Sequence, residues 1–412
     1  MAAEGWSALG VAAFRLILTA RLSVTLGIQV MYVAVGWNIY AMTGDVMALG
    51  LSGLAEAVPS IVVSLLSGYV ADRFNRKTVF LCAAGLQAVA ALLLVAVSLQ
   101  GREFYDAYGL APYYGVLVLT GFARGFMGPS LAALWGGLLP RELLANGATW
   151  YSTIYNAGAV TGPALGGVLY GFAGATVSYM TAAGFVAVAC MVMLGVRAPE
   201  QRKMASGESR LHQLTVGLKH IFSTPVLLGA MLLDMLAVLF GGALALLPAY
   251  AKDVLHTGPE GLGWLRAATF IGSISMGAVI AFVPPRRRSG WILLGSVAGY
   301  GVCMAAFAYS DVYWLSFAIL AASGAFDSVS MVIRGSITQL MTPDDMRGRV
   351  SAASGIFIVS SNEIGAFESG VAARYLGLQP SVLFGGVMTV IVVAAAAVLS
   401  PKLRSFSMDV EG

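Results

Sequence analysis

Ten charged residues of this 412-residue chain stand inside long apolar runs. Asp234, for example, lies in the middle of GAMLLDMLAVLFGG (229–242). The five acids are Glu56, Asp234, Asp327, Glu363 and Glu368, and the five bases are Arg21, Arg124, Arg266, Arg334 and Arg374. Charged groups in an apolar medium pair with one another or face a watery path. The set therefore predicts a path for protons or a solute.

The carboxylate of Asp234 has two interpretations. It could be fixed to an arginine of a neighbouring helix and hold the helices together, or it could take up a proton or bind a solute. Desolvation favours the neutral acid and a nearby arginine favours the charged one, so a moving partner can switch its state. The same two interpretations stay open for Glu56 and Glu363. Glu368 and Arg374, nearer the end of their segment, are predicted to form a gate pair or a rim.

Two spacings give geometric expectations. Asp327 and Arg334 lie on one helical face about 10 Å apart, which predicts no direct pair unless a third group bridges them. Glu363 and Glu368 point about 140° away from each other, so we expect them to have different roles.

The composition indicates which kind of structural element carries these charged residues. Hydrophobic residues make up 58% of the chain and charged residues 11%, the mean hydropathy is +0.82, and soluble domains are about one quarter charged. The sequence thus predicts an all-α integral membrane protein with segments of about 20 residues that cross the bilayer. Twelve are predicted: 16–40, 46–71, 78–99, 113–138, 149–172, 176–196, 225–250, 262–283, 291–309, 312–340, 350–376 and 381–399. The first is interrupted by Arg15 and Arg21, which argues against a cleavable signal peptide.

Lysine and arginine are distributed unevenly over the predicted loops. One alternate set of loops holds most of them, and the other has little beyond Arg102 and Lys252. By the positive-inside rule, the basic set and both termini are expected in the cytoplasm. The net charge of +4 then orients the protein against anionic lipid, with no nucleic-acid partner.

A polar stretch divides the chain into a six-helix bundle at 1–196, a cytoplasmic linker at 197–224 and a second six-helix bundle at 225–412. Within the linker, 210–222 is predicted to be an amphipathic helix. The two halves contain similar segments: LPRELLANGA (139–148) resembles TPDDMRGRVSA (342–352), with Pro140 matching Pro343. Six plus six crossings with weak internal symmetry are typical of transporters.

Two motifs suggest a family. GYVADRFNRK (68–77) resembles the G-x-x-x-D-R-x-x-R-K loop of the Major Facilitator Superfamily. The resemblance implies a cytoplasmic gate of Gly68, Asp72, Arg73, Arg76 and Lys77. The matching loop of the second half, VPPRRRSG (283–290), keeps its bases but lacks the acid.

The second motif is NAGAVTGPALGG (156–167). From the residues alone it is a close-packing face of small side chains. It also resembles the superfamily's antiporter motif, which implies a role for Gly158, Gly162, Pro163, Gly166 and Gly167. Arg124, followed by glycine in the fourth segment, resembles an arginine implicated in proton transfer.

The second half resembles the exporter branch of the superfamily that includes enterobactin exporters and macrolide efflux pumps. It implies two pseudo-symmetric bundles and a proton-coupled exporter of a drug or siderophore, monomeric, in the bacterial inner membrane. An importer or uniporter on the same fold is the alternative. A membrane enzyme or receptor is less favoured, because no metal cluster or nucleophile elbow is recognised and the cytoplasmic loop is too short for a folded domain. No ATP-binding loop is recognised, which argues against ATP hydrolysis. No cofactor or metal is predicted, and Cys82, Cys190 and Cys303 are not spaced as ligands.

Overall fold

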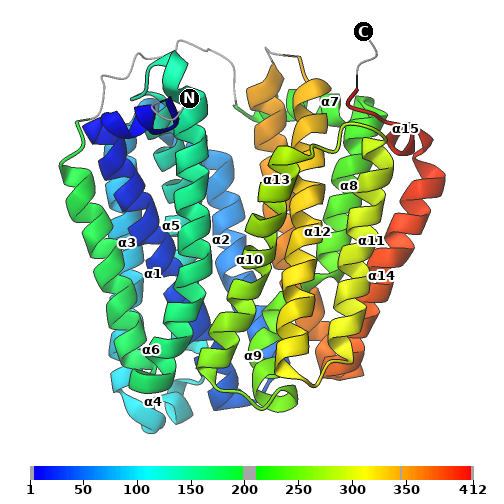
Figure 1. Cartoon of the computed structure of the whole chain (residues 1–412). Helices are drawn as coiled ribbons and strands as arrows, with labels where there is room; N and C mark the ends of the chain where they lie inside the picture. The colour runs from blue at the N-terminus through cyan, green and yellow to red at the C-terminus, as the bar shows by residue number, and fades with distance from the viewer. Residues whose placement is uncertain (1–3, 198–209, 344–345, 410–412) are drawn as a thin grey trace. The chain divides into compact units, whose positions relative to one another are not determined.

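The computed structural model describes residues 4–197, 210–343 and 346–409. Within these ranges, the side chains of 4, 5, 64–69, 71–73, 101, 102, 210–214, 352, 356, 358–360 and 363 fall outside the description. Every regular element in the described ranges is helical (Figure 1). A helix satisfies its backbone hydrogen bonds internally, as hydrocarbon requires.

The helices of the first half of the chain come in sequence order as follows. They are η1 (Glu4–Gly10), α1 (Ala12–Thr43), α2 (Val46–Arg73), α3 (Arg76–Leu99), α4 (Gly101–Tyr108), α5 (Ala111–Gly136), η2 (Arg141–Leu143) and α6 (Leu144–Leu194). The second half begins with α7 (Arg210–Ser223), α8 (Pro225–Phe240), η3 (Gly242–Leu246), α9 (Leu247–Ala249) and a π-helical turn (Tyr250–Val254). It continues with α10 (Pro259–Phe282), α11 (Ser289–Ala308), α12 (Tyr313–Leu340), α13 (Arg347–Leu376), α14 (Leu378–Leu399) and α15 (Pro401–Arg404).

Ten stretches of the described residues are long and apolar enough to cross a membrane. One of them, Arg141–Leu194, has 54 residues, more than twice what one crossing needs. Its helix α6 turns at Gly174, where φ is 77°, a backbone conformation that favours glycine. The expected segments 149–172 and 176–196 lie on either side of that turn.

The predicted seventh crossing, 225–250, differs from a single α-helix. The α-helix α8 ends at Phe240, and short 3-10, α and π turns continue the chain to Val254. Gly241 and Gly242 stand at the change, where two consecutive glycines lower the helix propensity. The interruption lies two turns after Asp234 in the same segment.

Contacts divide the chain into two compact units. Unit 1 comprises Met1–Met42, Ala55–Ser206 and Thr257–Ala267, and unit 2 comprises Thr43–Leu54, Gly207–His256 and Ala268–Gly412. In unit 1, α3 packs against α5 and α6 (Figure 1). Its main core joins Ile17 of α1, Phe80 of α3, Leu131 of α5 and Met193 of α6.

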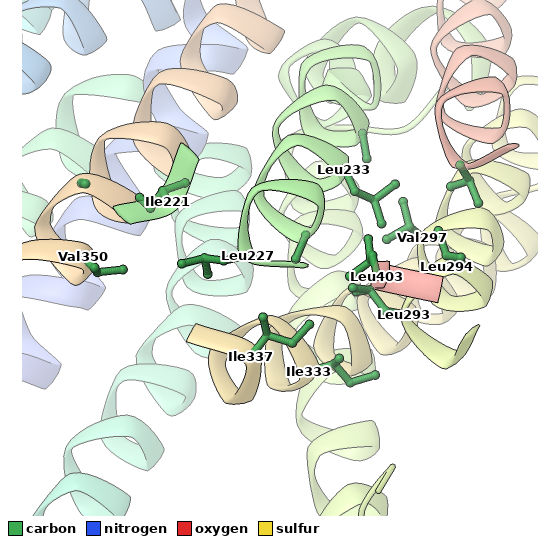
Figure 2. Packing of buried hydrophobic residues seen from close by; sticks show 14 residues of the cluster. Ile221, Leu227, Leu233, Leu293, Leu294, Val297, Ile333, Ile337, Val350 and Leu403 are labelled. Carbon is green, nitrogen blue, oxygen red and sulfur yellow. The ribbon is translucent and has the colours of Figure 1, made fainter. Parts of the chain in front are cut away.

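Unit 2 has its own apolar core. In it α11 packs between α12 and α14, and α8 packs against α13 and α14. Figure 2 shows Leu227 and Leu233 of α8 among side chains of α11 and α12, with Leu403 of α15 beside them. This core fixes the helices that carry Asp234 and Arg334.

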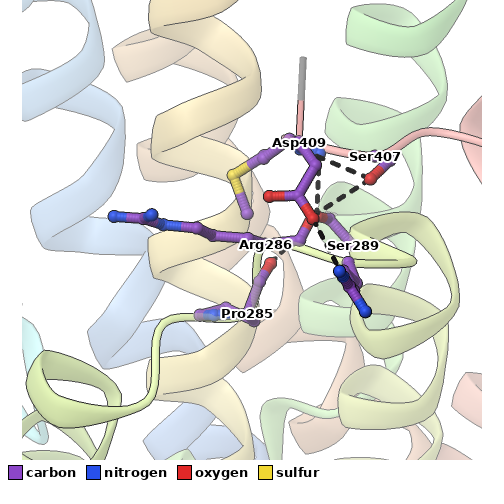
Figure 3. A network of polar contacts seen from close by, with 7 residues as sticks. Pro285, Arg286, Ser289, Ser407 and Asp409 are labelled. Atoms are coloured by element: carbon purple, nitrogen blue, oxygen red, sulfur yellow. Dashed lines mark hydrogen bonds and ion pairs between the residues drawn. The ribbon is translucent and has the colours of Figure 1, made fainter. Parts of the chain in front are cut away.

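Residues 407–409 form hydrogen bonds and an ion pair with the turn between α10 and α11 (Figure 3). Ser407 Oγ donates a hydrogen bond to the carbonyl of Arg286 at 3.2 Å, and Arg287 Nε lies 3.4 Å from Asp409 Oδ2. Ser289 Oγ donates to the carbonyl of Arg286 within the turn. Arg287 of the loop 283–290 thus has an acidic partner in Asp409, although the Arg287 side chain is 92% exposed.

Candidate functional site

The first buried charge cluster lies in unit 1 and joins three helices. Glu56 of α2 forms an ion pair with Arg124 of α5, with 2.5 Å between Glu56 Oε1 and Arg124 Nη1. Tyr32 of α1 donates its hydroxyl to the same carboxylate oxygen, and its ring centroid is 5.4 Å from Arg124 Cζ. The Glu56 side chain is only 6% exposed. The ion pair of Glu56 and Arg124 is neutral when both groups are ionised.

Two glycines bring α5 close enough to α2 for this pair. A Cβ atom at Gly121 would lie 2.1 Å from the carbonyl oxygen of Glu56, and one at Gly125 would lie 2.6 Å from Val63 Cγ1. Any larger residue at these two positions would push the helices apart. The glycine that follows Arg124 in the sequence therefore positions the arginine.

The second cluster lies in unit 2 between α8 and α12. Arg334 Nη1 forms an ion pair with Asp234 Oδ2, and Arg334 Nη2 lies 3.9 Å from Asp327 Oδ1. Arg334 Nε donates to Ser330 Oγ at 3.2 Å. The side chains of Asp234 and Arg334 are largely buried, while that of Asp327 is 44% exposed. Two acids share one base, so the cluster carries a net charge of −1 when both acids are ionised.

The expectation that Asp327 and Arg334 form no direct pair without a bridging group was wrong. Their Cα atoms are two helical turns apart, but side chains on a helix lean toward its N-terminus. The long Arg334 side chain therefore reaches back toward Asp327 and contacts it at 3.9 Å. Asp234 from α8 forms an ion pair with the same guanidinium.

Several predicted residues lie outside the described side chains. They are Gly68, Asp72 and Arg73 of the loop motif and Glu363 of α13. The remaining two members of the gate motif cap helices of unit 1: Arg76 Nη1 donates to the carbonyl of Ala133 at 2.8 Å, and Lys77 Nζ donates to the carbonyl of Leu194 at 2.8 Å. Cations at helix C-termini are favourable. The gate itself stays a prediction.

The glycine-rich face of α6 packs against α1 within unit 1. A Cβ atom would lie 2.9 Å from Thr25 Cγ2 at Gly158, 2.6 Å from Gln29 Cβ at Gly162 and 2.9 Å from Val30 Cα at Gly166.

The fourth glycine of the motif, Gly167, faces the start of α10, where a Cβ atom would lie 2.4 Å from the carbonyl oxygen of Pro259. Pro163 is buried within the same helix. The motif therefore packs against backbone and side chains of two other segments.

Arg374 forms an ion pair, but its partner is not the expected one. Its Nη1 atom lies 3.7 Å from Asp45 Oδ2, and both side chains are about half exposed. Nearby, a Cβ atom at Gly50 of α2 would lie 3.1 Å from the Cα atom of Gly370 of α13. Glu368 takes part in none of the ion pairs recorded for the described side chains.

Sequence reasoning overlooked Tyr32, Ser330 and Asp45. Tyr32 and Ser330 carry no charge that would distinguish them in an apolar helix. Asp45 falls between the predicted segments 16–40 and 46–71, so it was not among the charges expected inside the membrane. In the described residues, no group of three or more His, Cys, Asp or Glu is placed to hold a metal.

Comparison with known proteins relates this chain to transporters over nearly its full length. Multidrug efflux pump Tap of Mycolicibacterium fortuitum is 25% identical over 412 residues, which is 95% of this chain and 97% of that protein. Enterobactin exporter EntS of Citrobacter koseri is 27% identical over 398 residues, which is 96% of this chain and 93% of that protein.

Solved structures show the same fold at low identity. A D-xylose-proton symporter matches with a TM-score of 0.73 and 14% identity, covering 96% of this chain and 99% of that one. A bacterial homologue of the iron transporter ferroportin matches with a TM-score of 0.69 and 18% identity, covering 96% and 99%. A family model for the Major Facilitator Superfamily matches residues 17–358. The chain therefore belongs to the Major Facilitator Superfamily, whose members are secondary transporters and not enzymes.

Proposed function

We propose that this protein is a proton-coupled exporter that carries a small amphipathic molecule, such as a drug or a siderophore, out of the cytoplasm by alternating access. Two relatives, a multidrug efflux pump and an enterobactin exporter, support the direction of transport. The packing of the α6 glycine face against α1 is consistent with its resemblance to an antiporter motif. With both termini in the cytoplasm, the basic loops follow the positive-inside rule.

The observation that carries the proposal is the excess of acid around Arg334. Asp234 and Asp327 both contact this one guanidinium. A net negative charge inside a membrane is costly, and uptake of one proton cancels it. The ion pair of Glu56 and Arg124 is already neutral, so a proton on Glu56 would remove the negative charge that balances Arg124. We therefore assign proton uptake to the Asp234 cluster and a holding role to Glu56 and Arg124.

A transport cycle follows from this charge count. A proton that enters from outside neutralises one of the two acids, and Arg334 then pairs with the other. Release of the proton to the cytoplasm restores the competition for Arg334. The membrane potential supplies about 2.3 kcal/mol per charge per 100 mV, so no nucleotide is required.

Proton coupling can be tested in inverted membrane vesicles that contain the protein. After energisation has acidified their interior, a panel of drugs and siderophores is added, and interior pH is followed with a fluorescent dye. A transported compound should accumulate inside and release protons. Asp234→Asn should abolish both signals, while Asp311→Asn, which changes an exposed acid outside both clusters, should leave them unchanged. The proposal would be contradicted if the compound accumulated equally with and without a pH gradient. It would also be contradicted if protons entered the vesicles together with the compound.

A further inference from the structure

Arg21 of α1 is a cation held between two aromatic rings. Its Cζ atom lies 4.7 Å from the ring centroid of Tyr151 and 4.6 Å from that of Tyr155, both on α6. All three residues belong to unit 1. Arg21 Nε is buried and makes no hydrogen bond, and the residue as a whole is partly exposed.

Unlike the arginines of the two buried ion pairs, Arg21 has no recorded oxygen partner among the described residues. Arg124 pairs with Glu56 and Arg334 pairs with Asp234. Among the described residues, the recorded contacts of the Arg21 guanidinium are the two rings. An aromatic ring face attracts a cation. The five N–H groups of a guanidinium point outward in the plane of that group, so rings above or below this plane accept no hydrogen bonds from them. The group therefore has donors left for a ligand.

The surroundings hold the two rings in place. Arg21 lies one turn before Thr25, which contacts Gly158 of α6, so the close packing of α1 and α6 sets the position of the guanidinium. The ring of Tyr151 is stacked on Trp135 of α5, with 5.4 Å between centroids. Tyr155 is 38% exposed. The result is a cation with a fixed position beside the partly exposed side chain of Tyr155.

We propose that Arg21, Tyr151 and Tyr155 form a binding site for the carboxylate or phosphate group of an amphipathic anion. A guanidinium binds both groups through paired N–H donors, and the Tyr155 ring offers a surface for the apolar part of the ligand. The anion can come from a transported solute or from a phospholipid headgroup. The site depends on neither proton coupling nor the direction of transport.

Binding can be tested on the purified protein in an uncharged detergent with two matched probes. Salicylate carries a carboxylate, whereas salicylamide has the same ring and a neutral amide. Wild type should bind salicylate saturably and more tightly than salicylamide in equilibrium dialysis. Arg21→Gln should weaken salicylate binding at least tenfold, and Arg21→Lys should fall between the two. Arg15→Gln is the control, because Arg15 is exposed on the same helix and donates to the carbonyl of Leu9.

A second measurement needs no variant. Phenylglyoxal modifies accessible arginines, and mass spectrometry reads out the peptide that contains Arg21. Salicylate should slow the modification of Arg21 several-fold, and salicylamide should not. In nanodiscs, protection by phosphatidylglycerol but not by phosphatidylcholine or salicylate would identify the anion as a lipid headgroup. Equal modification of Arg21 under all these conditions overturns the proposal. Equal salicylate binding by Arg21→Gln and wild type overturns it when phosphatidylglycerol gives no protection either.

Discussion

Replacement of Asp234 by asparagine separates a proton-coupling role from a purely structural one. The amide keeps the shape of the side chain but removes its charge and stays neutral at any pH. Loss of a hydrogen bond between charged groups costs about 1.5–3 kcal/mol, and stranding a buried charge costs about 3–5 kcal/mol. Asp327 lies 3.9 Å from the same guanidinium and can take over the pairing. We therefore expect a loss near the lower end, about 2 kcal/mol of unfolding free energy.

Arg334→Gln is the matched comparison at the same site. It leaves Asp234 and Asp327 facing each other without a base, so the penalty should reach about 3–5 kcal/mol. The double variant Asp234→Asn with Arg334→Gln should regain part of that loss, because fewer charges remain unpaired. Thermal unfolding in detergent measures this order of stabilities.

Transport assays then decide the role of Asp234. If this acid couples protons, Asp234→Asn should lose accumulation driven by a pH gradient, yet keep exchange of substrate for substrate, which requires no proton release. A lower melting temperature, together with loss of both substrate exchange and gradient-driven uptake, would favour a structural role for Asp234. Full gradient-driven uptake by Asp234→Asn would refute the coupling assignment and leave Glu56 and Glu363 as the next candidates.

Three further predictions concern packing and gating. Gly162→Leu should destabilise the protein by at least about 1–3 kcal/mol, because a Cβ atom there would lie 2.6 Å from Gln29 Cβ. The control is Gly184→Leu on the same helix, where a Cβ atom would meet nothing within 4 Å and where we expect a wild-type melting temperature. Asp45→Asn should change the unfolding free energy by no more than about 1 kcal/mol, since its ion pair with Arg374 is half exposed; a loss several times larger in a thermal melt would show that the pair is structurally important. Asp72→Asn should melt like wild type and impair transport if the loop motif gates the protein, and normal cycling of that variant in proteoliposomes would rule the gate out.

Much of the helical architecture follows from the sequence, because hydrocarbon requires long apolar segments that satisfy their own backbone. The interruption after Phe240 was not predicted, since hydropathy stays high through Val254 and does not record where hydrogen bonding changes. Similarly, the turn in α6 depends on Gly174. Three other glycines, Gly166, Gly167 and Gly171, precede it closely, and composition alone does not distinguish the one that adopts a positive φ.

The charged residues of the site were recognised from their types, but their pairing was not. Which acid meets which arginine depends on which helices are neighbours, and periodicity within one helix holds no such information. Glu56 and Arg124 are brought together by the glycines of α5. Tyr32 carries no charge, and it becomes noticeable only once α1 is seen to lie beside both.

The predicted repeat gives a physical reason why the two clusters differ. When Pro140 is matched to Pro343, Arg124 of α5 falls on Asp327 of α12, at the same distance in sequence before each proline. In the first half a base occupies this position, and Glu56 of α2 neutralises it. In the second half an acid occupies it, so that Arg334, two turns further along α12, must serve both Asp327 and Asp234. Because a base stands at this position in the first half and an acid in the second, the pair of Glu56 and Arg124 is neutral, whereas Arg334 is the one base for Asp234 and Asp327. This excess of acid is why we assign proton uptake to the second cluster.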